Sequence, residues 1–227
     1  TAGAFSNRNM IINGSMTVSQ RGTSSTSGSY GSVDRMKVSH SDSNTQSQLS
    51  LSSADTPYSL GFRNAFRLQN STVSNAAAST YREIDYRIEA QDIANSGWDY
   101  TSTSSFITFS FWLKASVTQS YYLYIRTEDG TKRLLVKELA ATANTWKKFE
   151  LVIPGDSGIT LNNDNGFGLL FRFIPWYGTT YTGSGTLDAW ASDTNERVPN
   201  MTSTWVTTLN STFDLTGLQL EVGSKAT

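Results

Sequence analysis

The strongest constraint on the fold is a pattern that recurs along the whole chain, in which apolar and polar residues alternate over short stretches bounded by Gly, Asn, Asp or Ser. Successive side chains of an extended chain point to opposite faces, so this alternation is typical of β-strands. The pattern predicts strands over Met10–Ser19, Val33–His40, Gln46–Leu51, Phe62–Gln69, Tyr81–Ala90, Phe106–Ala115, Tyr121–Thr127, Arg133–Glu138, Lys147–Ile153, Phe167–Ile174 and Phe213–Val222.

The strand at Phe106–Ala115 carries apolar residues at both parities, which predicts a central strand buried on two sides. Only Ala90–Ala94 favours a helix, and Gly97 follows closely enough to limit it to one turn. Closely spaced strands with almost no helix predict an all-β fold, a two-sheet antiparallel β-sandwich of jelly-roll type with at most one or two short helical turns.

The length of 227 residues suits one sandwich, because such domains reach this size as a single unit. Residues 1–9 lack alternation and are predicted to be the end of a linker, whereas residues 10–227 are predicted to form one binding domain. The Ser-rich, Gly-rich stretch Gly22–Gly31 cannot bury apolar surface and is predicted to be a surface loop within that domain.

Charged residues make up only 16% of the chain, against about 25% in an average protein, and the net charge is −1. A chain with so little positive charge is not expected to bind nucleic acid. No stretch is long and apolar enough to span a bilayer, so membrane insertion is not expected. The absence of cysteine excludes disulfides and thiolate metal sites.

Several motifs resemble one family of modules. They are Asn7–Thr23 followed by Val33-Asp34-Arg35, Arg87–Asp92, Thr108–Ala115, Asn144–Lys147 leading to Ile153–Asp156, and Phe213–Thr227. Together they resemble the modules at the C-terminal ends of bacteriophage tail fibres, particularly of phages that infect marine bacteria. The resemblance implies a jelly roll similar to carbohydrate-binding modules, with the two terminal strands neighbours in one sheet and no catalytic residues.

The same resemblance implies the biological setting. The chain is expected to be a non-catalytic receptor-binding domain on the outer surface of a virion, assembled in the bacterial cytoplasm, and residues 1–9 would come from an upstream fibre segment. Its expected partners are a host surface glycan, two further copies in a homotrimer, and other fibre or tail proteins. The alternative is a structural or trimerisation domain with no glycan site of its own. The resemblance permits a structural calcium, which the sequence does not locate, and it implies no other cofactor.

The stretch Pro175–Gly185 carries large rings without strand periodicity, and binding residues concentrate on such loops. A sugar presents flat C–H faces and a rim of hydroxyls, so its site needs aromatic rings beside short polar side chains. The predicted ligand-binding residues here are Trp176, Tyr177 and Tyr181 beside Asp188, Asp193, Asn195 and Glu196. A structural interpretation stays open, in which these rings close the end of the sandwich or pack against a sister subunit.

A second candidate site is the pair Trp98 and Tyr100, which flank Asp99 just before the central strand and which a capped turn would also explain. By strand parity Tyr121, Tyr122 and Tyr124 cannot all face inward, so part of this set is predicted to lie on the surface as a sugar contact or a subunit interface.

Structural roles are predicted for several other residues. Trp112, Trp146 and Trp190 are assigned to the core, as is Met36, which replaces the Trp that the family commonly has after Asp-Arg. Arg21 is predicted to pair with Glu221 across adjacent terminal strands.

An enzyme is disfavoured by the sequence. His40 is the only histidine, and no Gly-x-Ser-x-Gly motif surrounds a serine. A pair of carboxylates for glycoside hydrolysis stays open among the acidic residues Asp156, Asp164, Asp188, Asp193 and Glu196.

Overall fold

The computed structural model describes residues 9–183, 185–194 and 197–225, which form two antiparallel sheets facing each other. Sheet A has the strand order β1 (Ser24–Ser25), β3 (Asn44–Ser50), β4 (Asn64–Asn70), β12 (Thr212–Val222), β6 (Phe106–Ala115), β9 (Lys147–Pro154). Sheet B has the order β11 (Trp190–Ser192), β8 (Arg133–Ala141), β7 (Gln119–Thr127), β10 (Phe167–Tyr177), β5 (Tyr81–Glu89), β2 (Lys37–His40). The predicted two-sheet β-sandwich is therefore confirmed.

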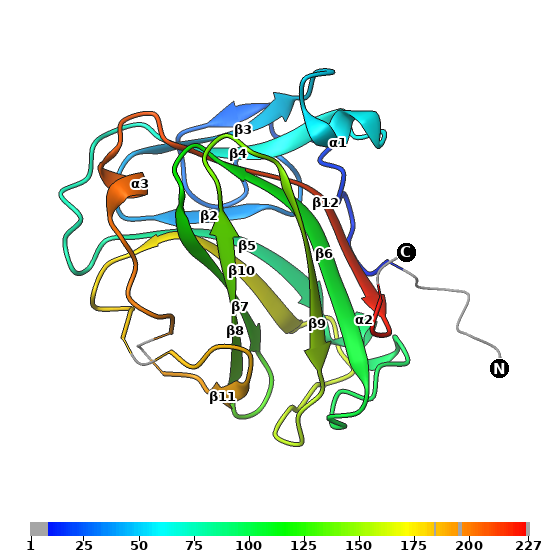
Figure 1. The fold of residues 1–227 in the computed structure, drawn as a ribbon. Coiled ribbons are helices and arrows are strands. Elements are labelled where there is room, and N and C mark those ends of the chain that lie inside the picture. The colour runs from blue at the N-terminus through cyan, green and yellow to red at the C-terminus, as the bar shows by residue number, and fades with distance from the viewer. Residues whose placement is uncertain (1–8, 184, 195–196, 226–227) are drawn as a thin grey trace.

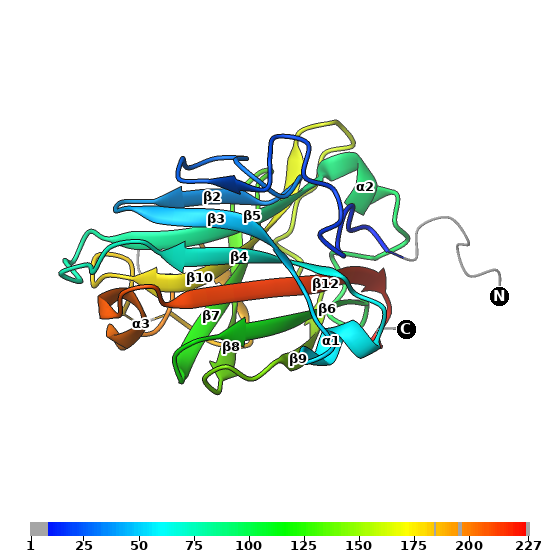
Figure 2. The same ribbon diagram turned by 90° about the horizontal axis from the view of Figure 1, so that it is seen from above.

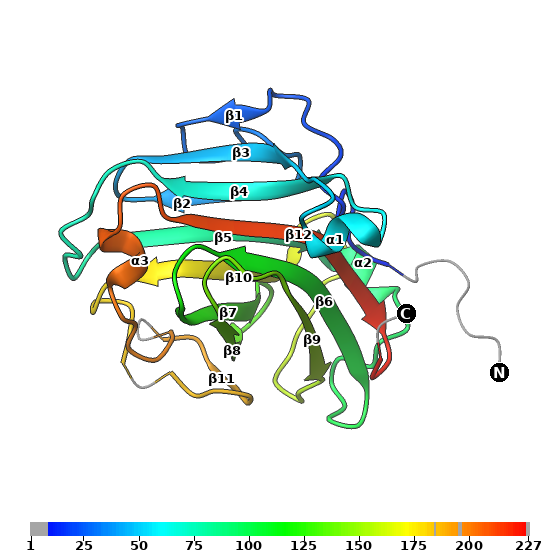
Figure 3. The ribbon, with the colours of Figure 1, turned by 45° about the horizontal axis from the view of Figure 1, so that its top comes forward.

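Figure 1 shows the two layers, and Figure 3 shows the strands of sheet A following one another from β1 to β6. The helices are short: α1 (Thr56–Ser59), α2 (Ala90–Ala94) and α3 (Thr204–Thr207). Figure 2 places all three at the ends and edges of the layers. In the described part of the chain no helix is long and apolar enough to cross a membrane, because the longest has five residues.

The main core lies between the sheets and is rich in aromatic rings. On β6, Phe109 and Phe111 are fully buried, and Phe109 lies 4.5 Å from Phe171 of β10, measured between ring centroids. Phe173 and Phe213 extend the same cluster. Large aromatic side chains contribute much of the apolar area that a sandwich can bury. The observed β6 has the predicted bounds, and its position beside β12 and β9 makes it an interior strand of sheet A.

The first predicted strand, Met10–Ser19, is wrong. Asn13 and Met16 have φ angles of 60° and 59°, and a left-handed residue interrupts an extended chain. This segment instead runs beside β12, where Met10 N donates to Leu220 O and Leu218 N donates to Gly14 O. Gly14 is required here because a Cβ atom would lie 2.0 Å from Leu218 O. The first described residues thus lie beside the last strand. The first strand, β1, is at the edge of sheet A and does not pair with β12, so the implied pairing of the two terminal strands is wrong.

The outer face of sheet A carries a second, smaller apolar cluster. Trp146 is buried and Trp112 is half-buried in this cluster, which lies under the segment around α1 and outside the main core. Asp55, next to α1, accepts hydrogen bonds from Lys114 Nζ and Trp146 Nε1, both at 2.8 Å. Burial alone would raise the pKa of Asp55, but these hydrogen bonds hold it well below its usual value. The segment around α1 is therefore attached to sheet A by a charged contact.

Candidate functional site

The predicted aromatic loop is a strand in its first part. β10 continues to Tyr177, and its pairing with β5 shifts register between Phe173 and Trp176. Trp176 is 5% exposed, belongs to the main core and donates from Nε1 to Thr80 Oγ1 at 3.0 Å. Tyr177 is 1% exposed on the opposite face and donates its hydroxyl to Glu83. The prediction that these two rings line an open site is therefore wrong.

Tyr181 is the one ring of the predicted loop that keeps solvent-accessible surface. It is half-buried and packs edge-on against Tyr81, with 5.9 Å between ring centroids. The ring centroid of Tyr177 lies 5.2 Å from that of Tyr181. Tyr181 stays a candidate contact, but Trp176 and Tyr177 offer it no exposed ring faces of the kind that was expected.

The acidic residues predicted beside these rings have cationic partners. Asp188 Oδ1 lies 2.7 Å from Lys137 Nζ. Asp193 Oδ2 lies 3.2 Å from Arg126 Nη1, and Asp193 Oδ1 lies 3.7 Å from Arg197 Nε. Asn195 and Glu196 lie outside the described residues. Asp156, another carboxylate considered for hydrolysis, is 3.0 Å from Arg133. The described carboxylates of this region thus attach loops to sheet B.

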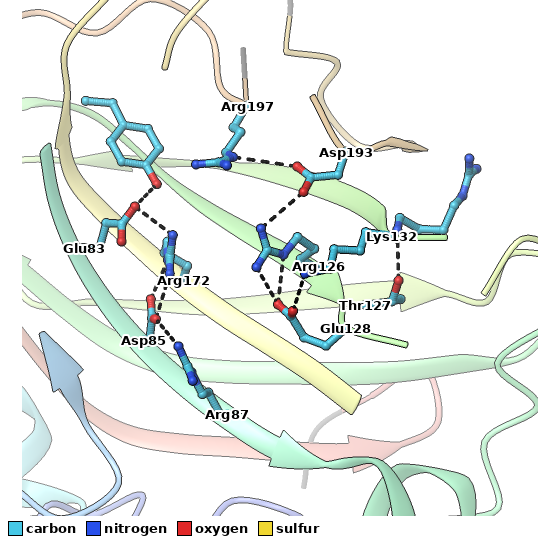
Figure 4. A network of polar contacts seen from close by, with 12 residues as sticks. Glu83, Asp85, Arg87, Arg126, Thr127, Glu128, Lys132, Arg172, Asp193 and Arg197 are labelled. Atoms are coloured by element: carbon cyan, nitrogen blue, oxygen red, sulfur yellow. Dashed lines mark hydrogen bonds and ion pairs between the residues drawn. The ribbon is translucent and has the colours of Figure 1, made fainter. Parts of the chain in front are cut away.

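The outer face of sheet B holds a network of buried charges. Figure 4 shows Arg172 between Glu83 and Asp85, with distances of 2.7 Å to Glu83 and 2.8 Å from Nη2 to Asp85 Oδ2. Burial raises the pKa of Glu83 above its usual value, although Arg172 opposes the shift. Burial also raises the pKa of Tyr124 to about 12, and its hydroxyl has no hydrogen-bond partner among the described residues.

Described residues between 178 and 203 cover this face of sheet B. The covering side chains pack on Tyr122, Tyr124, Leu134, Val136, Leu170 and Ile174, and they include Tyr181, Leu187, Val198 and Met201. Tyr122 is 6% exposed and Tyr124 is fully buried, so the prediction that strand parity leaves part of the tyrosine set on the surface is wrong. This face of sheet B is a second interior and offers no open binding surface at these tyrosines.

The second predicted site is also largely closed. Trp98 is 3% exposed, and its Nε1 donates to Ser105 O at 3.2 Å. Tyr100 is half-buried, with its ring 6.3 Å from that of Trp98. Trp98 is therefore a core residue, and Tyr100 alone retains a surface that a ligand could touch.

A different cavity brings an aromatic ring and several hydrogen-bonding groups together at the surface. It has a volume of about 310 Å³ and is lined by Gln20, Arg21, Tyr30, Asp34 and Arg35. None of these residues was predicted to bind a ligand. A signal was nevertheless present, since Tyr30 is a single ring in a loop of small polar residues, where no apolar neighbours are available to bury it.

The loop that carries Tyr30 is at the surface, as predicted, and is held by a buried side chain. Gln46 of β3 is 1% exposed, and its amide donates to Ser27 O at 2.7 Å and to Ser29 O at 3.2 Å. Gly31 lets the loop approach this amide, because a Cβ atom at Gly31 would lie 2.7 Å from Gln46 Nε2. The ring of Tyr30 therefore projects from a fixed backbone.

Asp34 and Arg35 lie on a tight turn between two buried side chains. Val33 is 0% and Met36 is 1% exposed, so the prediction of Met36 as a core residue is confirmed. The turn closes with a hydrogen bond from Met36 N to Val33 O at 3.2 Å. Arg35 has a φ angle of 73°, which is uncommon for a residue other than glycine. Asp34 Oδ1 accepts a hydrogen bond from Gln20 N at 3.0 Å, and this bond joins the turn to the segment that ends the stretch Met10–Gln20.

Arg21 faces this turn. Its Nη1 lies 4.0 Å from Asp34 Oδ1, and its side chain is 61% exposed. The ion pair of Arg21 is thus with Asp34, and the predicted pairing with Glu221 is wrong. The two family-like stretches Gln20-Arg21-Gly22-Thr23 and Val33-Asp34-Arg35 meet in space at this cavity.

Among the described residues no group of three or more His, Asp or Glu side chains could hold a metal ion. In the loop at 162–166, Asp164 Oδ1 accepts from Gly166 N and Asn163 Oδ1 accepts from Asn95 Nδ2, both at 2.9 Å. The structural calcium that the resemblance permits therefore has no site assigned to it in this part of the chain.

No family model matches the chain, and a search of curated proteins returns no match. Three solved structures share the fold at low sequence identity. The enzymatically active domain of tailspike protein 4 from bacteriophage CBA120 has a TM-score of 0.51 and 12% identity, over 95% of this chain and 22% of that chain. A Bacteroides thetaiotaomicron protein described as sugar-binding has a TM-score of 0.50 and 10% identity, over 95% and 100%.

A cyclase from Fischerella sp. TAU, solved with 4-(1H-indol-3-yl)butan-2-one, also has a TM-score of 0.50 and 10% identity, over 96% of this chain and 98% of that chain. This chain therefore spans about a fifth of the tailspike structure and nearly the whole of the other two. Because one fold hosts unrelated functions, these likenesses establish the fold alone.

Proposed function

We propose that the chain is a non-catalytic glycan-binding domain of a bacteriophage tail fibre, and that it binds a saccharide of the host cell surface in the cavity around Tyr30. The observation that carries the proposal is the composition of this cavity. One half-buried ring shares a hollow of about 310 Å³ with an amide, two guanidinium groups and a carboxylate. Such a set provides a flat apolar surface for a sugar ring and donors and acceptors for its hydroxyls.

The fold and the sequence motifs support this setting. A protein described as sugar-binding and a phage tailspike domain have the same fold, and the terminal motifs resemble those of tail-fibre modules. A shallow cavity of this kind would bind one saccharide weakly. Presentation on a trimeric fibre, with many fibres per particle, would raise the avidity by about 10² to 10⁴ without any new contact.

The test is the substitution Tyr30→Ala, which removes the proposed stacking surface. We expect the affinity for host surface polysaccharide to fall about tenfold or more, equivalent to a loss of about 1.4 kcal/mol. Isothermal titration calorimetry on the whole chain would measure this, with unfolding curves to show that the variant is folded.

The matched control is Tyr58→Ala, which removes a half-buried tyrosine of α1, outside the cavity. Tyr181→Ala tests the site first predicted from the sequence. A variant without Tyr30 that binds as well as the wild type, or a loss of binding confined to Tyr181→Ala, would contradict the assignment to this cavity.

A role in fibre assembly is the second candidate, and one groove favours it. This groove of about 450 Å³ beside β12 is lined partly by Ile12, Val18 and Phe62, and Ile12 is 53% exposed. A second copy of the chain could cover these apolar side chains. If it does, the mass measured in solution will be that of a trimer, and Ile12→Asp will dissociate it. A monomer at high concentration would rule out this role for the isolated chain.

A further inference from the structure

The charges of the Tyr30 cavity do not balance. Its lining contains the guanidinium groups of Arg21 and Arg35 and the single carboxylate of Asp34. This carboxylate already accepts a hydrogen bond from Gln20 N and faces Arg21 at 4.0 Å, and its side chain is only 18% exposed. Asp34 therefore neutralises at most one of the two cations, and an excess of positive charge remains in a chain whose net charge is −1.

Arg35 provides the excess charge. It is exposed, and within the described residues it has no ion-pair partner. Its backbone is fixed on both sides, because Val33 and Met36 are buried and their turn is closed by a hydrogen bond. The side chain thus extends from a rigid turn at the edge of the cavity. A guanidinium group presents a planar set of N–H donors that matches a carboxylate or a phosphate in a two-point contact.

Exposed arginines are common on protein surfaces, so exposure alone assigns no ligand to Arg35. The distinguishing feature is what shares its cavity. Arg21 is a second cation, 61% exposed, and Tyr30 offers a ring for stacking. A free anion would leave the ring of Tyr30 without a contact, and a neutral sugar would leave the excess positive charge without an anionic partner. A saccharide that carries an acid group would use all of them.

We infer that the saccharide bound in this cavity carries an anionic oxygen group, a carboxylate or a phosphate, which Arg35 and Arg21 contact while Tyr30 stacks on the sugar ring. This inference rests on the proposed glycan-binding function and names the class of glycan. It places the acid group over the Arg35 side of the cavity and leaves the hydroxyls of the sugar to Gln20 and Asp34.

The test compares matched saccharides with and without the acid group. Calorimetry on the whole chain would use oligogalacturonate, its neutral galactose counterpart, a phosphorylated hexose oligomer and inorganic phosphate alone. We expect the wild type to bind the uronate, the phosphorylated oligomer or both at least about tenfold more tightly than the neutral oligomer. Higher salt should weaken only the acidic ligands, because ions screen the exposed charges.

The variant Arg35→Ala should remove this preference, because it should lower the affinity for the acidic oligomers at least about tenfold more than the affinity for the neutral oligomer. Arg35→Lys should restore part of it, since the ammonium group keeps the charge and loses the planar donor set. The matched control is Arg63→Ala, which removes an exposed arginine that stacks on Tyr58 outside the cavity. It should leave both affinities unchanged.

The outcomes separate this inference from the proposed function. If the neutral oligomer binds as tightly as the acidic ones, and Tyr30→Ala abolishes both, the glycan-binding function stands and the inference is overturned. It is equally overturned if inorganic phosphate or polyglutamate binds as tightly as the uronate, because the sugar ring would then contribute nothing. If none of the saccharides and no host polysaccharide binds at millimolar concentration, the proposed function itself fails.

Discussion

Replacing Arg172 with methionine is expected to lower the free energy of unfolding by about 3–5 kcal/mol, the usual cost of removing one partner from a buried ion pair. Arg172 bonds both Asp85, which is fully buried, and Glu83, which is 7% exposed. Without the guanidinium group two buried carboxylates remain on the face of sheet B that also carries the apolar cluster around Tyr124. Methionine keeps most of the apolar stem of the side chain, so lost packing would explain little of the effect.

Thermal and urea unfolding would measure the loss. For a chain of this length, each kcal/mol corresponds to about 2–4 °C in Tm. Arg172→Lys should be intermediate, because one ammonium group cannot contact both carboxylates with the same geometry. Arg63→Met, at an exposed arginine just before β4, should change the stability by less than about 0.5 kcal/mol. A loss below about 1 kcal/mol for Arg172→Met would show that water reaches the two carboxylates.

The alternation of residues predicted most strands, because it depends only on which faces are buried. It succeeded best at Phe106–Ala115, where apolar residues at both parities indicated an interior strand and β6 has the same bounds. It failed at Met10–Ser19, whose alternation is equally clear. There the left-handed residues Asn13 and Met16 bend the backbone, and the segment bonds to β12 without forming a strand. The alternation of apolar and polar residues does not show that Asn13 and Met16 have positive φ angles.

The predicted site failed for a reason that lies in tertiary structure. Consecutive side chains of a strand face opposite sides, so either Trp176 or Tyr177 should have been open to solvent if sheet B had one covered face. Both are buried, Trp176 in the main core between the sheets and Tyr177 because described residues between 178 and 203 pack over the other face. The sequence of this covering segment is polar and rich in glycine, and it gave no sign of that path. Tyr30 was overlooked because the sequence does not show that the loop Gly22–Gly31 and the turn at Asp34 and Arg35 line the same cavity.

On the opposite sheet, Arg67→Met is expected to lower the free energy of unfolding by about 2–4 kcal/mol at pH 7. Arg67 Nε and Nη2 donate to the two oxygens of Asp214 at 2.7 and 2.8 Å. Asp214 is fully buried, and its other cation, Lys114, lies 4.0 Å away. The effect should be smaller than at Arg172, since Arg67 is 27% exposed and only one carboxylate loses its partner.

The pH dependence identifies the cause. Burial raises the pKa of Asp214 above its usual value, against the opposing effect of Arg67 and Lys114. A carboxyl group whose pKa is higher in the folded state costs stability as the pH rises above its unfolded value of about 3.9. Removing Arg67 raises the pKa of Asp214 in the folded state further, so the difference in stability between wild type and variant should grow from pH 3 to pH 7.

Lys148→Met is the control, at a lysine on the same sheet with a 48% exposed side chain, and its effect on stability should change little with pH. A difference for Arg67→Met that is constant across this range would mean that its cost comes from lost packing of the arginine stem and not from the unpaired carboxylate.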